Sequence, residues 1–134
     1  MNLLVDTSVW SLALRRSNQS RAKEVEILEE SIHLGRAEII GPIRQELLSG
    51  IKSESQFQAL RSALEPFPDV VLDREDFETA AVFFKKCRKK GVQGSNTDFL
   101  ICSVAHRRSF KILTTDKDFE KIEKTLGLFL LPHN

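Results

Sequence analysis

The 134-residue sequence contains no tyrosine and a single tryptophan, Trp10. Proteins that bind single-stranded nucleic acid commonly stack bases on exposed aromatic rings, so this scarcity weakens such an interpretation. Most of the nine phenylalanines, such as Phe83 and Phe99, lie in apolar patterns that are typical of a protein core. We therefore expect the aromatic side chains to serve mainly in packing.

Cysteine is also scarce, with two residues, Cys87 and Cys102, and no CxxC pair. A chain of this length buries enough surface to fold without disulfides, so reduced thiols and a cytoplasmic location are expected. No apolar run approaches the roughly 20 residues of a membrane span. The first residues, MNLLVDTS, are too short to resemble a signal peptide and contain no basic side chain.

Charge of one sign is likewise not in excess, since the net charge is +1. This balance alone favours neither nucleic acid nor a membrane surface as a partner. With 41% hydrophobic and 29% charged residues, the chain has the composition of a folded globular protein. We find no linker or repeat and expect one domain over residues 1–134.

Short apolar segments alternate with amphipathic ones along the chain. The apolar segments predict strands over residues 2–5, 37–40, 70–72, 111–115 and 128–131. Helices are expected between them, over residues 7–16, 20–34, 42–51, 53–64, 74–90, 98–108 and 116–126. Strands that alternate with helices favour an α/β fold in which a mostly parallel sheet of four to five short strands carries helices on both faces.

Four acidic residues occupy similar positions in this pattern. Asp6 follows the first predicted strand, and Asp116 follows the fourth. Glu46 lies about one turn into the helix after the second strand, and Asp98 lies in the first turn of an almost wholly apolar helix. Because ligands of parallel α/β sheets bind at the carboxyl ends of the strands, we expect the four acids to converge there.

Each acid also has a structural explanation. Asp6, Asp98 and Asp116 stand near helix starts, where carboxylates bond free N–H groups and favour the helix dipole. Glu46 suits a solvated helix face. Considered together, however, clustered carboxylates repel one another unless a cation lies among them. Ligands that are all oxygen suit the hard cations Mg²⁺ or Mn²⁺.

Four segments resemble the successive motifs of PIN-domain ribonucleases and, more narrowly, of the VapC-type toxins of toxin–antitoxin pairs. These segments are LLVDTSVW, PIRQELLSG, GSNTDFLICSVA and ILTTDKDF, and they follow the family order over the whole chain. The resemblance implies a three-layer PIN-like fold and a metal-dependent ribonuclease. It assigns catalysis and metal binding to Asp6, Glu46, Asp98 and Asp116. It also implies an RNA substrate, a cognate antitoxin and a homodimer.

The resemblance suggests a role for each acid. Asp6 and Asp98 are expected to bind Mg²⁺ or Mn²⁺ directly, Glu46 to ligate or orient a water, and Asp116 to complete a second position. Whether one or two ions bind stays open. Asp116 is preferred over Asp118 because it lies nearer the strand end. The sequence also leaves open the contribution of several polar neighbours, which are Ser8, Asn96, Thr115 and Asp118.

Three groups of cations are candidates for phosphate contacts. They are the segment KKCRKK at residues 85–90, the group Arg107, Arg108 and Lys111, and the group Arg15, Arg16, Arg21 and Lys23. Phosphate contacts of this kind give salt-dependent affinity without reading the base sequence. A solvated helix face is the competing interpretation and is favoured for residues 85–90.

Two other functions stay open at this stage. A haloacid-dehalogenase-like phosphatase also has an acid after its first strand, but it needs a second acid two residues later, where this sequence has Ser8. In a non-catalytic α/β interaction module, the acids would serve only as caps. The apolar stretch that includes Trp10, Leu12 and Leu14 suits either core packing or an antitoxin helix.

Overall fold

The computed structural model describes residues 1–14 and 22–132. The strands are β1 (Leu3–Val5), β2 (Ala37–Glu38) and β3 (Lys111–Leu113). The helices are α1 (Thr7–Leu14), α2 (Lys23–His33), α3 (Gly41–Ser49), α4 (Glu54–Leu64), α5 (Arg74–Lys89), α6 (Asn96–Arg108) and α7 (Asp118–Leu126). None of the helices in these described ranges is long and apolar enough to cross a membrane.

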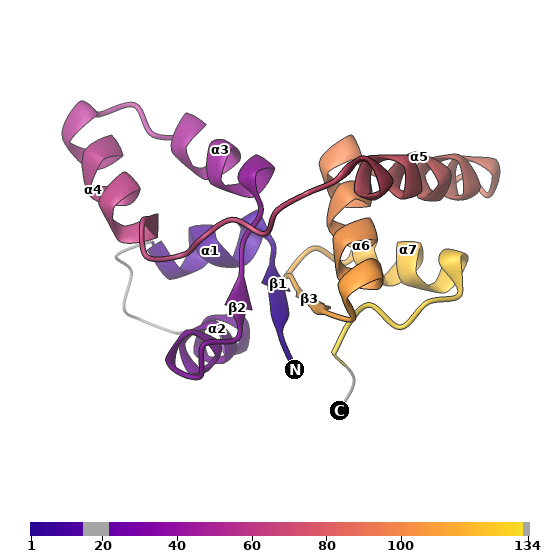
Figure 1. Cartoon of the computed structure of the whole chain (residues 1–134), viewed down its shortest axis with the longest axis horizontal. Coiled ribbons are helices and arrows are strands. Elements are labelled where there is room, and N and C mark those ends of the chain that lie inside the picture. The colour runs from indigo at the N-terminus through magenta and orange to yellow at the C-terminus, as the bar shows by residue number, and fades with distance from the viewer. Residues whose placement is uncertain (15–21, 133–134) are drawn as a thin grey trace.

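The three strands form a parallel sheet in the order β2-β1-β3. Leu3 of β1 pairs with Ala37 on one side and with Lys111 on the other. The sheet lies between one group of helices, α1 to α4, and a second group, α5 to α7 (Figure 1). The predicted α/β class is therefore confirmed. Because the strands are parallel, the segments that follow β1, β2 and β3 all leave from the same edge.

The predicted strand at residues 70–72 does not form. Its neighbourhood makes one isolated parallel bridge, between Ile39 and Asp69, with a hydrogen bond from the Val70 N–H to the Ile39 carbonyl (2.9 Å). Val71 is 85% exposed, so this apolar residue has no buried face to hold it in a sheet. Pro68, just before the bridge, lacks the N–H that a longer ladder would need.

The predicted last strand, residues 128–131, also does not form. Leu130 is buried, and its carbonyl accepts a hydrogen bond from the Ile112 N–H of β3 (2.7 Å). However, the N–H groups of Leu130 and Leu131 both donate to the carboxylate of Glu123 (2.7 Å each). The Glu123 side chain thus accepts the N–H hydrogen bonds that would otherwise pair this segment with another strand. The described sheet therefore has three strands rather than the predicted four or five.

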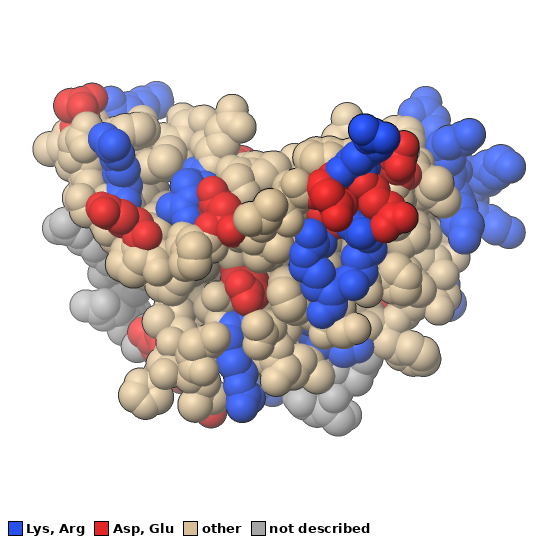
Figure 2. Space-filling view, viewed as in Figure 1, with Lys and Arg blue, Asp and Glu red and all other residues tan. Residues whose placement is uncertain are grey.

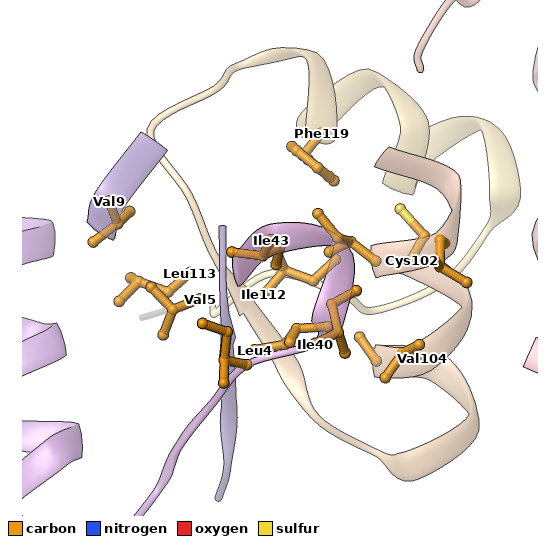
Figure 3. Packing of buried hydrophobic residues seen from close by; sticks show 14 of the residues in the cluster. Leu4, Val5, Val9, Ile40, Ile43, Cys102, Val104, Ile112, Leu113 and Phe119 are labelled. Carbon is orange, nitrogen blue, oxygen red and sulfur yellow. The ribbon is translucent and has the colours of Figure 1, made fainter. Parts of the chain in front are cut away.

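The core forms where the sheet meets α6 and α7. Leu4, Val5 and Ile112 are completely buried and belong to one cluster that also includes Phe119 of α7 (Figure 3). Helix α6 is buried over residues 99–105, as its nearly continuous apolar sequence predicts. This deep helix fixes its own first turn, which carries Asp98, close to the carboxyl edge of the sheet.

Several predicted helix boundaries are confirmed by their capping contacts. Ser53 accepts a hydrogen bond from the Gln56 N–H at the start of α4, and Asp73 caps α5. Gly127 ends α7 with φ +68°, a conformation that glycine adopts without a Cβ clash. The predicted start of the helix over residues 20–34 lies outside the described residues.

An ion cluster joins the start of α5 to the end of α6. The buried carboxylate of Asp76 accepts hydrogen bonds from the guanidinium groups of Arg107 (2.6 Å) and Arg108 (2.6 and 2.9 Å). Arg107 also contacts the exposed carboxylates of Asp73 (2.7 Å) and Glu75 (2.6 Å). The two arginines therefore act as structural ion-pair partners, rather than as free cations.

Candidate active site

Asp6 is the most tightly held of the four acids. It is 8% exposed and follows β1 directly. Its Oδ1 accepts a hydrogen bond from the Thr7 N–H (2.8 Å), while its Oδ2 accepts from the hydroxyls of Ser8 (2.9 Å) and Thr114 (2.8 Å). Three donors thus fix the orientation of one carboxylate at the carboxyl edge of the sheet.

Thr114 joins Asp6 to Asp116. It is the first residue after β3, and its hydroxyl oxygen, besides donating to Asp6, accepts a hydrogen bond from the Asp116 N–H (2.9 Å). The carboxylate of the half-buried Asp116 accepts in turn from the N–H of Asp118 (2.9 Å), whose own side chain is exposed. Sequence reasoning missed Thr114, because the predicted strand over residues 111–115 placed it inside the strand, whereas β3 ends at Leu113.

Asp98 lies in the first turn of α6 and shares a capping box with Ser95. The Ser95 N–H donates to the Asp98 carboxylate (2.9 Å), and the Asp98 N–H donates to the Ser95 hydroxyl (3.1 Å). Burial raises the pKa of the Asp98 carboxyl, and the negative charges of Asp6 and Asp116 raise it further. The hydrogen bonds with Ser95 lower the pKa of Asp98 by less than this, so the charges of Asp6 and Asp116 act on Asp98.

Glu46 lies on the exposed surface of α3. Its carboxylate accepts a long hydrogen bond, 3.4 Å, from the hydroxyl of Thr7. The N–H of Thr7 also donates to Asp6, so Glu46 reaches the Asp6 carboxylate through one intervening residue. In the space-filling view, the molecule is hollowed between the surface over α3 and α4 and the surface over α5 and α6 (Figure 2). Glu46 and Asp98 thus belong to elements on opposite sides of this hollow.

The remaining candidates have more peripheral positions. The Ser8 hydroxyl accepts a hydrogen bond from the Thr115 N–H (3.2 Å), whereas the Thr115 side chain is exposed. Asn96 is exposed in the first turn of α6. Asp116 lines a cavity of about 500 Å³ beside α2, and Asp98 is not among the residues that line this cavity. The five cations of residues 85–90 are solvent-exposed, whereas Cys87 in the same segment is buried. Arg15, Arg16 and Arg21 lie outside the described residues.

The donor chemistry of this acidic centre suits a hard divalent cation, because all candidate ligands are carboxylate or hydroxyl oxygens. In residues 1–14 and 22–132, no three histidine, cysteine, aspartate or glutamate side chains gather closely enough to hold a metal ion among themselves. Mg²⁺ keeps several waters and usually takes one or two carboxylates from the protein, so it does not require such a group.

The fold and site define a parallel α/β protein with an acidic centre at the carboxyl edge of its sheet. The family model described as PIN domain matches residues 3–125, and the chain belongs to the PIN-domain family. PIN domains are generally nucleases, so the predicted enzyme class is supported at that level. A comparison with curated protein sequences found no match.

Two solved structures share the fold over nearly the whole chain. The crystal structure of FitAcB from Neisseria gonorrhoeae is 19% identical, with a TM-score of 0.75, over 97% of this chain and 96% of that one. The crystal structure of VapBC2 from Rickettsia felis, bound to a DNA fragment from their promoter, is 19% identical, with a TM-score of 0.72, over 100% of both chains. At this identity, the likeness establishes the common fold.

Proposed function

We propose that this protein is an endoribonuclease that depends on Mg²⁺ or Mn²⁺ and acts as the toxin of a toxin–antitoxin pair. Membership of the PIN-domain family supports a nuclease. The all-oxygen character of the acidic centre supports a divalent cation, and the resemblance of four motifs to VapC-type toxins supports RNA as the substrate.

The observation that carries the proposal is the hydroxyl of Thr114, which holds Asp6 and orients the backbone of Asp116 at the same time. Simple helix capping requires no such link between the segments after β1 and β3. The nearby Asp98 is half-buried where the charges of both other acids disfavour its ionised form. A bound cation removes this repulsion, which gives the cluster a chemical purpose that capping lacks.

In the proposed site, Asp6 and Asp98 hold the ion, and Asp116 completes its surroundings directly or through water. The ion, when bound, supplies an activated water and stabilises charge on the phosphodiester oxygens. Glu46 is exposed and weakly held by Thr7, so its carboxylate is free to orient the attacking water. Ser8 and Thr114 keep Asp6 in one orientation.

A cognate antitoxin and a homodimer complete the proposal. The similarity to the VapBC2 complex, together with the VapC-like motifs, supports both. Trp10, which sequence reasoning left open as an antitoxin contact, is 4% exposed and packs edge-on against Phe67 (5.3 Å between ring centroids), so it belongs to the core. Leu14 is 43% exposed at the end of α1 and is the better candidate for a partner contact.

The central test is cleavage of a labelled RNA pool by the purified chain, with Mn²⁺, with Mg²⁺ or with a chelator. We expect cleavage only with a divalent ion, and about a 100-fold or larger loss in Asp6→Asn and Asp98→Asn, in line with the loss of one preorganised charged group. Asp116→Asn should also lose activity. Asp118→Asn is the matched control, because this exposed acid lies on the same turn and contributes only its N–H.

Chelator-resistant cleavage, or full activity in both Asp6→Asn and Asp98→Asn, would contradict the metal mechanism. Release of phosphate from small phosphoesters without RNA cleavage would favour the phosphatase alternative, although Ser8 uses its hydroxyl on Asp6 and offers no second acid. A non-catalytic module would respond to no divalent ion. Expression in a bacterial host tests the toxin assignment: the wild-type chain should arrest growth, and Asp6→Asn should not.

A further inference from the structure

The positive charge of this protein is concentrated in one segment. Residues 79–97 contain five cations, Lys85, Lys86, Arg88, Lys89 and Lys90, and no acidic residue. This segment carries +5 while the whole chain carries +1, so the other residues together carry −4. The five cations are exposed and form no ion pair with any described side chain. Figure 2 shows Lys and Arg side chains gathered over the outer end of α5.

Two neighbouring hollows lie at this cationic end of α5. One, of about 390 Å³, lies between α5 and the start of α6 and is lined by Phe77, Lys85 and Asn96 among others. The other, of about 340 Å³, includes Arg88 and Gln93. Phe84 and Phe99 line both hollows, which therefore lie next to each other along α5 and are together called the groove along α5. The groove ends at the first turn of α6, which also carries Asp98.

The floor of this groove is aromatic. Phe77 is 53% exposed, and Phe84 is half-buried. The ring of Phe84 is fixed by an edge-on contact with Phe99 (5.4 Å between centroids), and the Arg88 guanidinium lies 5.7 Å from its centre. Exposed rings and stacked guanidinium groups are the surfaces on which unpaired bases stack. The scarcity of tyrosine and tryptophan is thus offset here by two rings with exposed surface, the exposed Phe77 and the half-buried Phe84.

We infer that the groove along α5 binds a single-stranded segment of a nucleic acid, with its bases on the phenylalanine floor and its phosphates on Lys85 and Arg88, and leads it to the acidic centre. This inference rests on the proposed function for the identity of that strand as RNA. A second copy of this chain fits the groove less well, because a two-fold interface there would bring ten unpaired cations, five from each copy, against one another.

The test is fluorescence anisotropy of a labelled single-stranded RNA with the full chain in chelator, where cleavage does not interfere. The double variant Lys85→Gln/Arg88→Gln should bind about tenfold more weakly at low salt, and its slope of log affinity against log salt should fall by about 1.4, which corresponds to two phosphate contacts. Lys86→Gln/Lys90→Gln is the matched control. It removes the same charge from the same helix end but does not touch the groove, so its slope should change by less than half as much.

Stacking is tested separately with Phe84→Leu, which keeps an apolar side chain but removes the ring. Its affinity should fall about tenfold, whereas Phe129→Leu, a change at a 79% exposed ring outside the groove, should bind as wild type does. A duplex of the same sequence should bind more weakly than the single strand, because its bases are not available for stacking. Thermal unfolding of each variant confirms that it is folded.

Equal losses in the two double variants, or duplex binding as tight as that of the single strand, would overturn the inference. The inference would also be overturned if the groove variants changed their molecular mass in light scattering while their affinity for RNA stayed the same. That result would identify the groove as a subunit interface. If the wild type cleaves RNA but the groove variants bind it as tightly as wild type does, the groove fails and the nuclease stands. If RNA binds in the groove but is not cleaved in the presence of any divalent ion, the groove stands and the proposed nuclease function fails.

Discussion

At the scale of single residues, Thr114 is as well placed as any of the acids. It stands directly after β3, as Asp6 stands directly after β1, and the two side chains meet across the pair of strands at 2.8 Å. Asp6 and Asp116 could be proposed as site residues from the sequence, because each carboxylate comes shortly after a buried strand. A threonine after a strand is ordinary, so its role becomes visible only when register places it opposite Asp6.

Thr114→Val should lower activity by about 10–100-fold, as is typical when a group that orients a metal-site carboxylate is removed. Valine keeps the shape of threonine but cannot donate to Asp6 or accept from Asp116. The metal dependence distinguishes this positioning role from general damage: the variant should need a higher Mn²⁺ concentration for half-maximal cleavage. Thr115→Val is the control, since its side chain is exposed, and an equal effect in both variants would argue against the role of Thr114.

Asp98 illustrates a residue whose position opposes stability. Its pKa is raised by burial and by Asp6 and Asp116, so the folded state disfavours its charge. Because this folded pKa lies above the unfolded value, the destabilisation appears as the pH rises through the raised pKa and is present at neutral pH. An acid retained under such conditions indicates a function rather than a structural need.

Asp98→Asn should therefore stabilise the metal-free protein at neutral pH by about 0.5–1 kcal/mol, within the range of single stabilising substitutions. Asparagine can still accept the Ser95 N–H, so the helix cap is retained. Chemical denaturation in chelator at pH 7 and at pH 4 measures the effect, which should shrink at the lower pH. A less stable variant at pH 7 would show that Asp98 acts mainly as a cap.

At the scale of elements, α5 and α6 are joined by charge at one end and by apolar packing along their length. Asp76 is fully buried, and its pKa is lowered chiefly by the hydrogen bond from Arg108. The hydroxyl of Ser103 donates to the Asp76 carbonyl (2.7 Å), which ties the same residue to the middle of α6. This joint holds α6, and with it the turn that carries Asp98, against the rest of the protein.

Asp76→Asn should destabilise the protein by about 3 kcal/mol, because removal of one partner leaves buried charge uncompensated. The folded pKa of Asp76 lies below the usual value of 3.8, so its contribution is complete above pH 3.8 and is lost as the pH falls further. Wild type should therefore lose stability on acidification more steeply than the variant. Glu75→Gln is the control: this 70% exposed partner of Arg107 should contribute little, about 0.5 kcal/mol.

The elements also show where sequence patterns suffice and where they do not. The apolar run in α6 and the capping residues Ser53 and Asp73 predicted real helices, because these signals are local. The segments 70–72 and 128–131 have the same apolar composition as true strands, yet they do not pair along their length. Their outcome depends on distant partners, such as the Glu123 carboxylate, which occupies two N–H donors of the last segment.

At the scale of the whole molecule, the acidic centre connects the two groups of helices. Glu46 comes from the first group and Asp98 from the second, while Asp6 and Asp116 follow the central strands (Figure 1). An ion held by Asp6 and Asp98 would therefore join β1 to the second group. Such a bond stabilises the folded chain as a unit, because the unfolded chain does not bring these residues together.

With Mn²⁺ at a hundred times its dissociation constant, the free energy of unfolding should rise by about 2.7 kcal/mol, and the melting temperature by roughly 8 °C. Trp10 fluorescence, which reports on α1 in the first group, and circular dichroism, which reports on all helices, should shift together. Asp98→Asn should show almost none of this shift, so that it is more stable than wild type in chelator and less stable in Mn²⁺. This reversal of the stability order between chelator and Mn²⁺ distinguishes ion binding from an effect on packing. If the order does not reverse, the acids act only as helix caps.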